Sequence, residues 1–457
     1  MNRRLRRAGV FAAVAALTLV SPALGEAAAV PFLVVAGAVF FGVREGRWFE
    51  ILALPGDRDE GRLYGIVAFT LAVGGLAAFA SLPREPLPYG ALVIAALTVG
   101  VGRLGHELVY RRSDAEFPLV TGYLLAGTAA AVIGQVIVAV QFPTGRPAAS
   151  VNATSGTAAG AEVGAVVAAL PTFVFLASVA ALTAALIRSL VYARDAHLTV
   201  VIVAFVAWAF TALDPTVTAP GIVGALAVTV ALGYASYALG TASVPGMLTG
   251  VLLALLTLVL GGVGWFLTLV AFYAIGGLAS KYRFDEKTER GVAQENQGAR
   301  GTGNVLANSA VALAALLGYA ATGHIDVPAA PFGFAFAGAV ATALADTLSS
   351  EIGGLYDDPR LITTLRPVEA GTDGAVTWQG ELAGIAGATL VGSIAAVGMP
   401  LGDPIVSGVI VVAGGVAGMS VDSFLGALIE GDRVGNQSVN FLATLSGAIV
   451  AVAVAVV

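Results

Sequence analysis

Long apolar segments separated by short polar ones make up almost the whole chain. Apolar runs of about 17 to 25 residues recur from end to end, and a helix of that length crosses a hydrocarbon core of roughly 30 Å. A helix also satisfies its own backbone hydrogen bonds inside such a core. The pattern therefore predicts an all-α fold, a polytopic integral membrane helical bundle with about 15 transmembrane helices. The predicted spans cover residues 9–24, 28–43, 63–81, 89–108, 119–140, 161–187, 197–213, 219–239, 246–260, 264–279, 303–320, 332–349, 382–399, 405–428 and 439–457.

Composition agrees with this pattern and excludes several classes of protein. Hydrophobic residues make up 58% of the 457 residues and charged residues only 11%, whereas soluble domains average roughly 25% charged residues. A water-soluble fold is thereby excluded. The chain has no cysteine, so disulfides, thiolate metal sites and cysteine nucleophiles are ruled out. Its formal net charge of -6 leaves no basic surface for a nucleic acid.

The distribution of arginines predicts how the chain is oriented. Four of them, Arg3, Arg4, Arg6 and Arg7, precede the first apolar run and place the N-terminus in the cytoplasm of a cell-membrane protein. With fifteen spans, nearly all other basic loop residues fall on the same side, and only Arg84 and Arg146 fall outside. Residues 1–25 also resemble a secretory signal peptide. A retained first helix is favoured, because a second apolar run follows at once as its hairpin partner.

Two regions differ in their polar content. Residues 1–218 have ordinary loops and form an N-terminal membrane region of unknown role. Residues 219–457 hold the long polar loops, all predicted on the cytoplasmic face, and nearly all the unusual polar residues at helix ends. We find no internal repeat, so an inverted-repeat transporter gains no support. The candidate chemistry lies in four polar segments of this second region.

The first polar segment leads from Lys281 through a glycine-rich stretch into a predicted helix. Backbone N–H groups at such a helix start approach anions readily, and Arg300 adds a positive charge. Asn304 and Asn308 lie four residues apart on one helix face at membrane depth, where lone amides are costly. For the charged run of residues 283–290 the favoured interpretation is a solvated loop, whereas for Arg300, Asn304 and Asn308 an anion-binding role is favoured.

The second polar segment ends a glycine- and alanine-rich helix. Asp346, Ser349 and Ser350 share one helix face, and Glu351 lies just beyond them. Carboxylates and hydroxyls at that depth suit a Mg²⁺ ion bridging phosphates, because magnesium takes hard oxygen ligands. The alternative is a helix end whose polar groups reach toward water. Carboxylates at a helix C-terminus oppose the helix dipole, which disfavours that alternative.

The third polar segment is the loop from residue 358 to residue 377. It combines guanidinium forks, hydroxyls and glycines, a set that can wrap a polyphosphate. Taken alone, this composition is a weak signal for phosphate binding. If the loop lies beside Asp346, however, phosphate ligands and metal ligands meet on one membrane face. The loop residues concerned are Arg360, Thr363, Thr364, Arg366, Gly371, Thr372 and Gly374.

The fourth polar segment lies near the cytoplasmic end of the fourteenth predicted helix. It contains Asp422 and Ser423 and is followed by residues 436–442. A buried carboxylate at this position pairs with an arginine or a metal, or makes a structural hydrogen bond. Both alternatives remain open on the residues alone.

These segments carry a resemblance. Residues from about 220 to 457 resemble an integral-membrane family, long known only as a domain of unknown function, that includes the plant phytyl-phosphate kinase and the animal transmembrane protein nineteen. One departure from the family pattern is Leu348-Ser349, where a Trp-Ala pair is common. The matching strings are Trp265-Phe266-Leu267 with Lys281-Tyr282, Gly298-Ala299-Arg300 to Asn308, Asp346-Thr347 to Gly353, residues 359–364 to Thr377, and residues 422–427.

The resemblance implies transfer of the γ-phosphate of CTP to an isoprenoid monophosphate, giving phytyl or geranylgeranyl diphosphate. The partners are then the lipid bilayer, an isoprenoid phosphate and a nucleoside triphosphate. Asp346, Glu351 and Arg366 are the expected catalytic residues, and Mg²⁺ would be held by Asp346 and Glu351, with Asp422 as a further ligand. The expected substrate and nucleotide contacts are Lys281, Arg300, Asn304, Asn308, Ser350, Arg360, Thr363, Thr364, Gly371, Thr372, Gly374 and Ser423.

Two other functions share these features. A cytidylyltransferase that makes a CDP-lipid needs the same metal and phosphate contacts. A transporter or binding protein for an anionic lipid or solute would use cytoplasmic arginines, although few charges fall at mid-membrane. Prenyl chain length, nucleotide preference and oligomeric state stay open at this stage.

Overall fold

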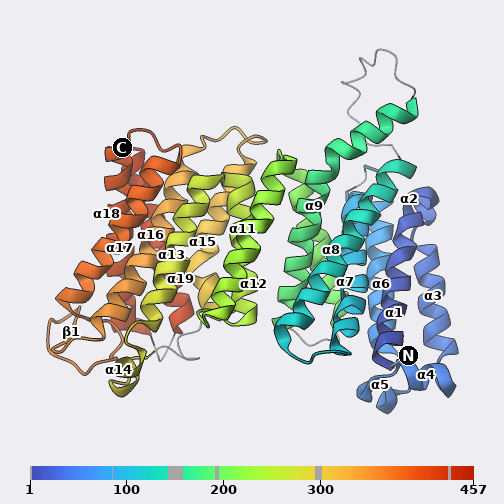
Figure 1. The fold of residues 1–457 in the computed structure, drawn as a ribbon, viewed down its shortest axis with the longest axis horizontal. Coiled ribbons are helices and arrows are strands. Elements are labelled where there is room, and N and C mark those ends of the chain that lie inside the picture. The colour runs from blue at the N-terminus through green and yellow to red at the C-terminus, as the bar shows by residue number, and fades with distance from the viewer. Residues whose placement is uncertain (1–2, 85, 143–157, 191–194, 294–300, 431–433) are drawn as a thin grey trace. The chain divides into compact units, whose positions relative to one another are not determined.

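The computed structural model describes residues 3–84, 86–142, 158–190, 195–293, 301–430 and 434–457. The chain divides into an N-terminal unit, Met1–Val223, and a C-terminal unit, Gly224–Val457, which Figure 1 draws from blue to red. The boundary expected at residue 218 precedes α11 (Ala219–Ala238). The N-terminal unit contains α1 (Arg3–Ala16), α2 (Ser21–Leu24), α3 (Val30–Gly42), α4 (Gly46–Leu52), α5 (Pro55–Glu60), α6 (Tyr64–Ala80), α7 (Tyr89–Tyr110), α8 (Glu116–Gln141), α9 (Ala158–Leu190) and α10 (Ala196–Ala212).

The C-terminal unit is a helical bundle with one short hairpin. A π-helical turn, Thr257–Gly261, follows α12, and β1 and β2 pair antiparallel, with Arg360 opposite Val376. Its elements after α11 are α12 (Val244–Leu256), α13 (Val263–Lys281), α14 (Phe284–Glu289), α15 (Thr302–Ala321), α16 (Ala330–Gly353), β1 (Arg360–Leu361), β2 (Ala375–Val376), α17 (Trp378–Gly398), α18 (Pro404–Ile429) and α19 (Asn436–Ala455).

The predicted fold class, a polytopic helical membrane protein, is confirmed. Over the described ranges, 12 helices are long and apolar enough to cross a membrane. Every one of the fifteen predicted spans overlaps a helix, but α3, α6 and α10 are shorter than the twelve spans, in which helical turns prolong α1 to Ala27 and α12 to Gly261. At 1.5 Å per residue, α3, α6 and α10 fall short of a core roughly 30 Å thick. The count of fifteen spans is therefore not confirmed.

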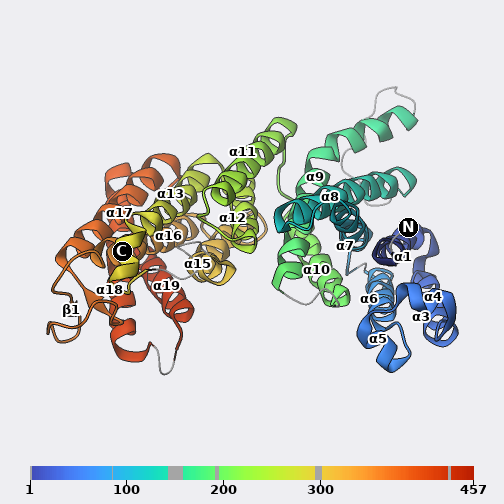
Figure 2. The same ribbon diagram turned by 60° about the horizontal axis from the view of Figure 1, so that its bottom comes forward.

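Helix α16 is the centre of the C-terminal unit. It packs against α13, α15, α17, α18 and α19, which surround it in Figure 2. Small residues permit this packing: a Cβ on Gly418 of α18 or on Gly447 of α19 would overlap the hydroxyl of Thr342 on α16. Thr342 in turn donates its hydroxyl to the carbonyl of Gly338 (2.9 Å). The helix that carries Asp346 is therefore held on every side.

The irregular elements of the C-terminal unit lie at one end of its helices. Figure 1 shows α14 and the β1 strand at the end where α13 and α16 finish. Thr377 joins this region to the bundle, because its hydroxyl accepts the N–H of Gly380 (3.2 Å) as the N-cap of α17 and donates to the carbonyl of Gly353 (3.3 Å). The polar segments of the sequence thereby meet where α16 ends.

Candidate functional site

A polar cavity of about 380 Å³ lies at the C-terminal end of α16. All four polar segments of the sequence contribute to its wall, although they are separated by as many as 160 residues along the chain. The lining side chains that bear polar groups are Ser280, Asn304, Asn308, Asp346, Thr347, Ser349, Ser350, Tyr356, Thr372, Asp373, Thr377, Asp422, Ser423, Glu430, Asn436 and Asn440.

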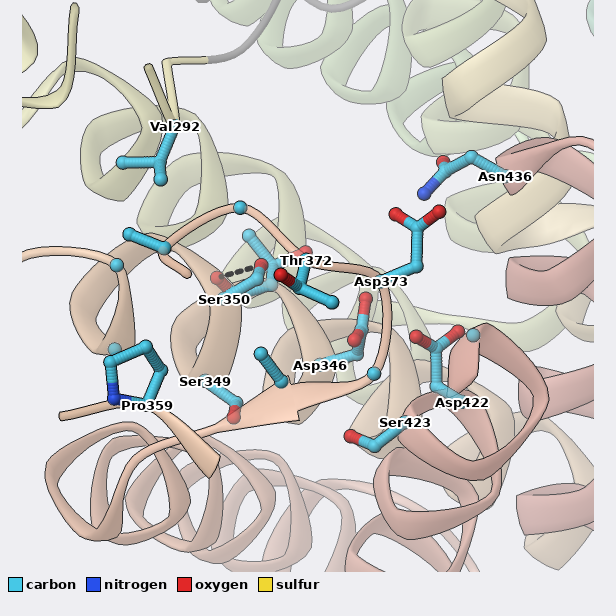
Figure 3. A pocket seen from close by; sticks show the side chains of 18 of the residues that line it. Val292, Asp346, Ser349, Ser350, Pro359, Thr372, Asp373, Asp422, Ser423 and Asn436 are labelled. Atoms are coloured by element: carbon cyan, nitrogen blue, oxygen red, sulfur yellow. Dashed lines mark hydrogen bonds between the residues drawn. The ribbon is translucent and has the colours of Figure 1, made fainter. Parts of the chain in front are cut away.

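Two carboxylates from different helices meet in the cavity. Asp346 of α16 and Asp422 of α18 interact directly, and Figure 3 shows both side chains directed into the same space. Oxygen Oδ1 of Asp422 is buried and has no hydrogen-bond partner. Buried polar atoms without a partner are rare in folded proteins because they have lost water without compensation. Because Asp422 also lines the cavity beside Asp346, this oxygen is placed where it could bind a ligand.

A second acidic pair lies nearer the outer loops. Burial and the charge of Asp373 raise the pKa of Glu430, and a hydrogen bond from Asn436 opposes the shift. Figure 3 shows the carboxylate of Asp373 facing the amide of Asn436. Repulsion between two carboxylates favours the neutral form of one of them. Together with Asp346 and Asp422, four carboxyl groups line one cavity.

Two asparagine pairs stand at the starts of two helices. In α15 the amide of Asn308 donates to the carbonyl of Asn304 (3.0 Å). In α19 the amide of Asn440 donates to the side-chain oxygen of Asn436 (3.2 Å). Each pair is spaced by four residues, and all four side chains line the cavity, so amide groups form part of its polar wall.

The loop that closes the cavity depends on a glycine. Gly374 has a φ of +73°, and a Cβ there would come within 2.5 Å of the carbonyl oxygen of Ser423. Only glycine adopts that conformation without strain and lets the loop approach α18 this closely. Residues 370–375 thereby reach the cavity; in Figure 3 Thr372 lies near Ser350, and Asp373 lies above Asp346 and Asp422.

The donor set of this cavity fits Mg²⁺. Its described lining has four carboxyl groups and no Arg, Lys or His. Across the described ranges, no three His, Cys, Asp or Glu side chains form a ready-made metal cage. Magnesium in phosphate-transfer sites is held by one or two carboxylates, with water and substrate phosphates completing the octahedron. Asp346 and Asp422, with the partnerless Oδ1, match that requirement.

Glu351 does not join this pair. Its carboxylate accepts a hydrogen bond from the ammonium of Lys287 (2.5 Å), and the two side chains are 3% and 1% exposed. The same ammonium donates to the carbonyl of Ala279 (2.7 Å). Glu351 therefore ties α14 to α16, and it is absent from the described lining of the cavity. Lys287 lies in the charged stretch that the sequence favoured as a solvated loop, yet it is almost fully buried.

The predicted loop contacts divide into two groups. Gly371, Thr372 and Gly374 line the cavity, as do Asn304, Asn308, Ser350 and Ser423. The other loop residues, Arg360, Thr363, Thr364 and Arg366, are exposed and do not line it. The guanidinium of Arg360 instead donates to the carbonyl of Leu365 (2.8 Å) and braces the hairpin. Lys281 lies outside the cavity beside Phe284, and Arg300 falls outside the described residues.

Four of the cavity residues with carboxyl or amide side chains, Asp373, Glu430, Asn436 and Asn440, were not among those expected from the sequence. Asn436 and Asn440 repeat the i, i+4 amide spacing of Asn304 and Asn308, a signal that was available. Asp373 stands between residues already singled out. Glu430 had no local signal, because it follows the last residue of an apolar helix and gains its place only through the fold.

Comparison with known proteins covers the C-terminal unit. Residues 227–448 match the family described as integral membrane protein DUF92. An uncharacterized membrane protein of Methanocaldococcus jannaschii is 34% identical over 215 residues, which are 45% of this chain and 83% of that protein. The chloroplastic protein VTE6 of Arabidopsis thaliana is 33% identical over 219 residues, 46% of this chain and 64% of VTE6, so the match spans less than two thirds of that plant protein.

A third relative belongs to a cyanobacterium. An uncharacterized membrane protein of Synechocystis is 30% identical over 198 residues, 42% of this chain and 74% of that protein. No solved structure matches the chain. The matched segment contains Asp346, Asp422 and every other described residue that lines the polar cavity.

Proposed function

Because the chain belongs to the DUF92 family of integral membrane proteins, we propose that it is a membrane-embedded kinase that acts on an isoprenoid phosphate. The donor is CTP, and the acceptor is a monophosphate of the phytyl or geranylgeranyl type, which becomes the diphosphate. The similarity to VTE6 and the resemblance of residues 220–457 to the family of the plant phytyl-phosphate kinase support this proposal.

One observation carries the proposal: Asp346 and Asp422 face each other in a cavity whose described lining holds no basic side chain. A phosphate is repelled by such a cavity unless a divalent cation enters with it. The cavity therefore suits a metal–nucleotide complex better than a free anion.

In the proposed reaction, Asp346 and Asp422 would hold Mg²⁺, which would supply neutralisation of phosphate charge. The side chains of Asn304, Asn308 and Asn436 line the space that the phosphates would occupy, and the backbone at Gly371 and Gly374 lets the loop lie against it. An oxygen of the acceptor phosphate forms a bond to the γ-phosphorus of CTP. The bond from that phosphorus to the β–γ bridging oxygen breaks, and CDP leaves with the electron pair.

No general base is required by this chemistry. The acceptor is a phosphate monoester, whose oxygens are already nucleophilic at neutral pH, so catalysis consists of positioning and charge neutralisation. The cavity meets that need with carboxylates, amides and hydroxyls. We place this face in the cytoplasm, where nucleoside triphosphates are abundant, in accordance with the arginine distribution.

The test is turnover with CTP, Mg²⁺ and geranylgeranyl phosphate in purified membranes. CTP labelled at the γ-phosphate should transfer its label to the lipid, whereas CTP labelled at the α-phosphate should not. Label from the α-phosphate would instead establish a CDP-lipid-forming cytidylyltransferase.

Asp346→Asn should lower turnover by roughly 10²- to 10³-fold, the scale found for preorganised electrostatic groups, while the protein stays folded. The matched control is Asp403→Asn, at the N-cap of α18, because asparagine also caps helices and the site lies at the other end of that helix. Near-wild-type turnover of Asp346→Asn would refute the assignment of the metal site.

A further inference from the structure

A second, mainly apolar cavity of about 220 Å³ lies in the same unit, among α11, α12 and α13. Its wall includes Leu232 of α11, Gly250 of α12 and Val270 of α13. Val305 of α15 completes it. The proposed chemistry uses none of these residues, so the cavity needs an explanation of its own.

The apolar cavity and the polar cavity share two helices. On α15, Val305 lines the apolar cavity, whereas its neighbour Asn304 lines the polar one. On α13, Tyr273 lines the apolar cavity and Ser280, two helical turns further on, lines the polar one. The hydroxyl of Tyr273 lies 2.6 Å from that of Ser309 and joins α13 to α15. One molecule with a polar head and an apolar tail would therefore contact the same two helices in both cavities.

A positive charge lies at one end of the apolar cavity. The ammonium of Lys281 is 3.9 Å from the position that a Cβ on Gly240 would take, and the residues on either side of Gly240 line the cavity. Lys281 also lies against the ring of Phe284, 5.8 Å from its centroid. Lys281 directly follows Ser280, which lines the polar cavity, and a lysine at the end of an apolar cavity is suited to an anionic head group with a hydrocarbon chain.

We propose that this apolar cavity binds the hydrocarbon chain of the isoprenoid phosphate, with Lys281 at the passage between chain and phosphate. The proposal rests on the proposed kinase function and names the tail site that this function requires. An isoprenoid chain moves into this cavity from lipid, which is equally apolar, so the transfer itself favours no particular chain. Specificity then comes from van der Waals packing between the methyl-branched chain and the cavity wall.

Gly250 offers a direct test, because it lines the cavity and a Cβ there meets no atom within 4 Å. Gly250→Leu should fill the cavity without moving the backbone. The matched control is Gly224→Leu on α11, which also has open space around its Cβ but does not line the cavity. The kinetic readout compares a C20 acceptor, geranylgeranyl phosphate, with a C5 acceptor, dimethylallyl phosphate.

For the C20 acceptor, Gly250→Leu should raise KM roughly ten- to hundredfold, the fold-change that corresponds to overfilling a packed site. KM for the C5 acceptor and kcat for both should stay within about twofold, and Gly224→Leu should match the wild type. An equal effect of Gly250→Leu on both acceptors, or no effect on either, would overturn the tail site.

A binding readout separates this inference from the kinase function. Geranylgeranyl phosphate with a photoreactive diazirine at its far end should label peptides of α11 to α13, and unlabelled geranylgeranyl phosphate should compete while a phosphatidylglycerol should not. Labelling of these helices without turnover refutes the kinase and keeps the tail site. Turnover with labelling elsewhere, or equal competition by the phospholipid, refutes the tail site and keeps the kinase.

Discussion

The buried pair of Lys287 and Glu351 allows a sharp test of what Glu351 does. The ammonium nitrogen of Lys287 lies 2.5 Å from a carboxylate oxygen of Glu351, and the two side chains are 1% and 3% exposed, respectively. Lys287→Met leaves the Glu351 carboxylate buried without its cation, a change that costs about 3–5 kcal/mol. For a domain of this size, that corresponds to a fall of roughly 6–20 °C in Tm.

Two further variants complete the test. Lys287→Met/Glu351→Met replaces both charges with apolar groups of similar volume and should recover most of the lost stability. Arg290→Met is the matched control, because the pair of Arg290 and Asp357 joins the same region at 2.7 Å but Asp357 is 86% exposed. An exposed pair contributes about 0–1 kcal/mol. Tm would be measured in detergent, and turnover normalised to folded protein.

The result also assigns the role of Glu351. If Glu351 only ties α14 to α16, the double variant is folded and retains turnover. A well-folded double variant without turnover would show that Glu351 contributes to the reaction, as the sequence suggested. A Tm within about 2 °C of the wild type for Lys287→Met, where roughly 6 °C or more is expected, would refute the energetic argument itself.

Two other predictions concern pH and orientation. Burial and Asp373 raise the pKa of Glu430 above its ordinary 4.5, so the folded chain holds that proton more tightly and stability is lost as pH rises from about 4.5 through the raised pKa. In buffer without divalent cations, Tm should fall less over that pH range in Glu430→Gln than in the wild type. The same dependence of Tm on pH in both proteins would contradict this. Thr372→Cys should react only with a reagent admitted to the cytoplasm and Thr322→Cys only from outside; labelling of both from one side would overturn the orientation.

The sequence alone determined the helices and several cavity residues. Apolar length defines a membrane helix almost regardless of its neighbours, so every predicted span overlaps a helix. Asn304, Asp346 and Asp422 were found because a polar side chain in an apolar segment is costly and therefore conspicuous. Apolar length and a polar residue inside an apolar segment can both be recognised within the sequence of a single helix.

The pairing of side chains across helices was decided by the tertiary structure. Glu351 is five residues from Asp346, so it faces another direction on α16 and meets Lys287 instead of the cavity. Arg360 was expected at the phosphates, yet the hairpin register directs it to the carbonyl of Leu365. Helical periodicity shows which residues share a face of one helix. It does not show which other segment packs against that face, because this depends on backbone contacts such as the one between Gly374 and α18. Those contacts join residues far apart in the chain, so no local pattern reveals them.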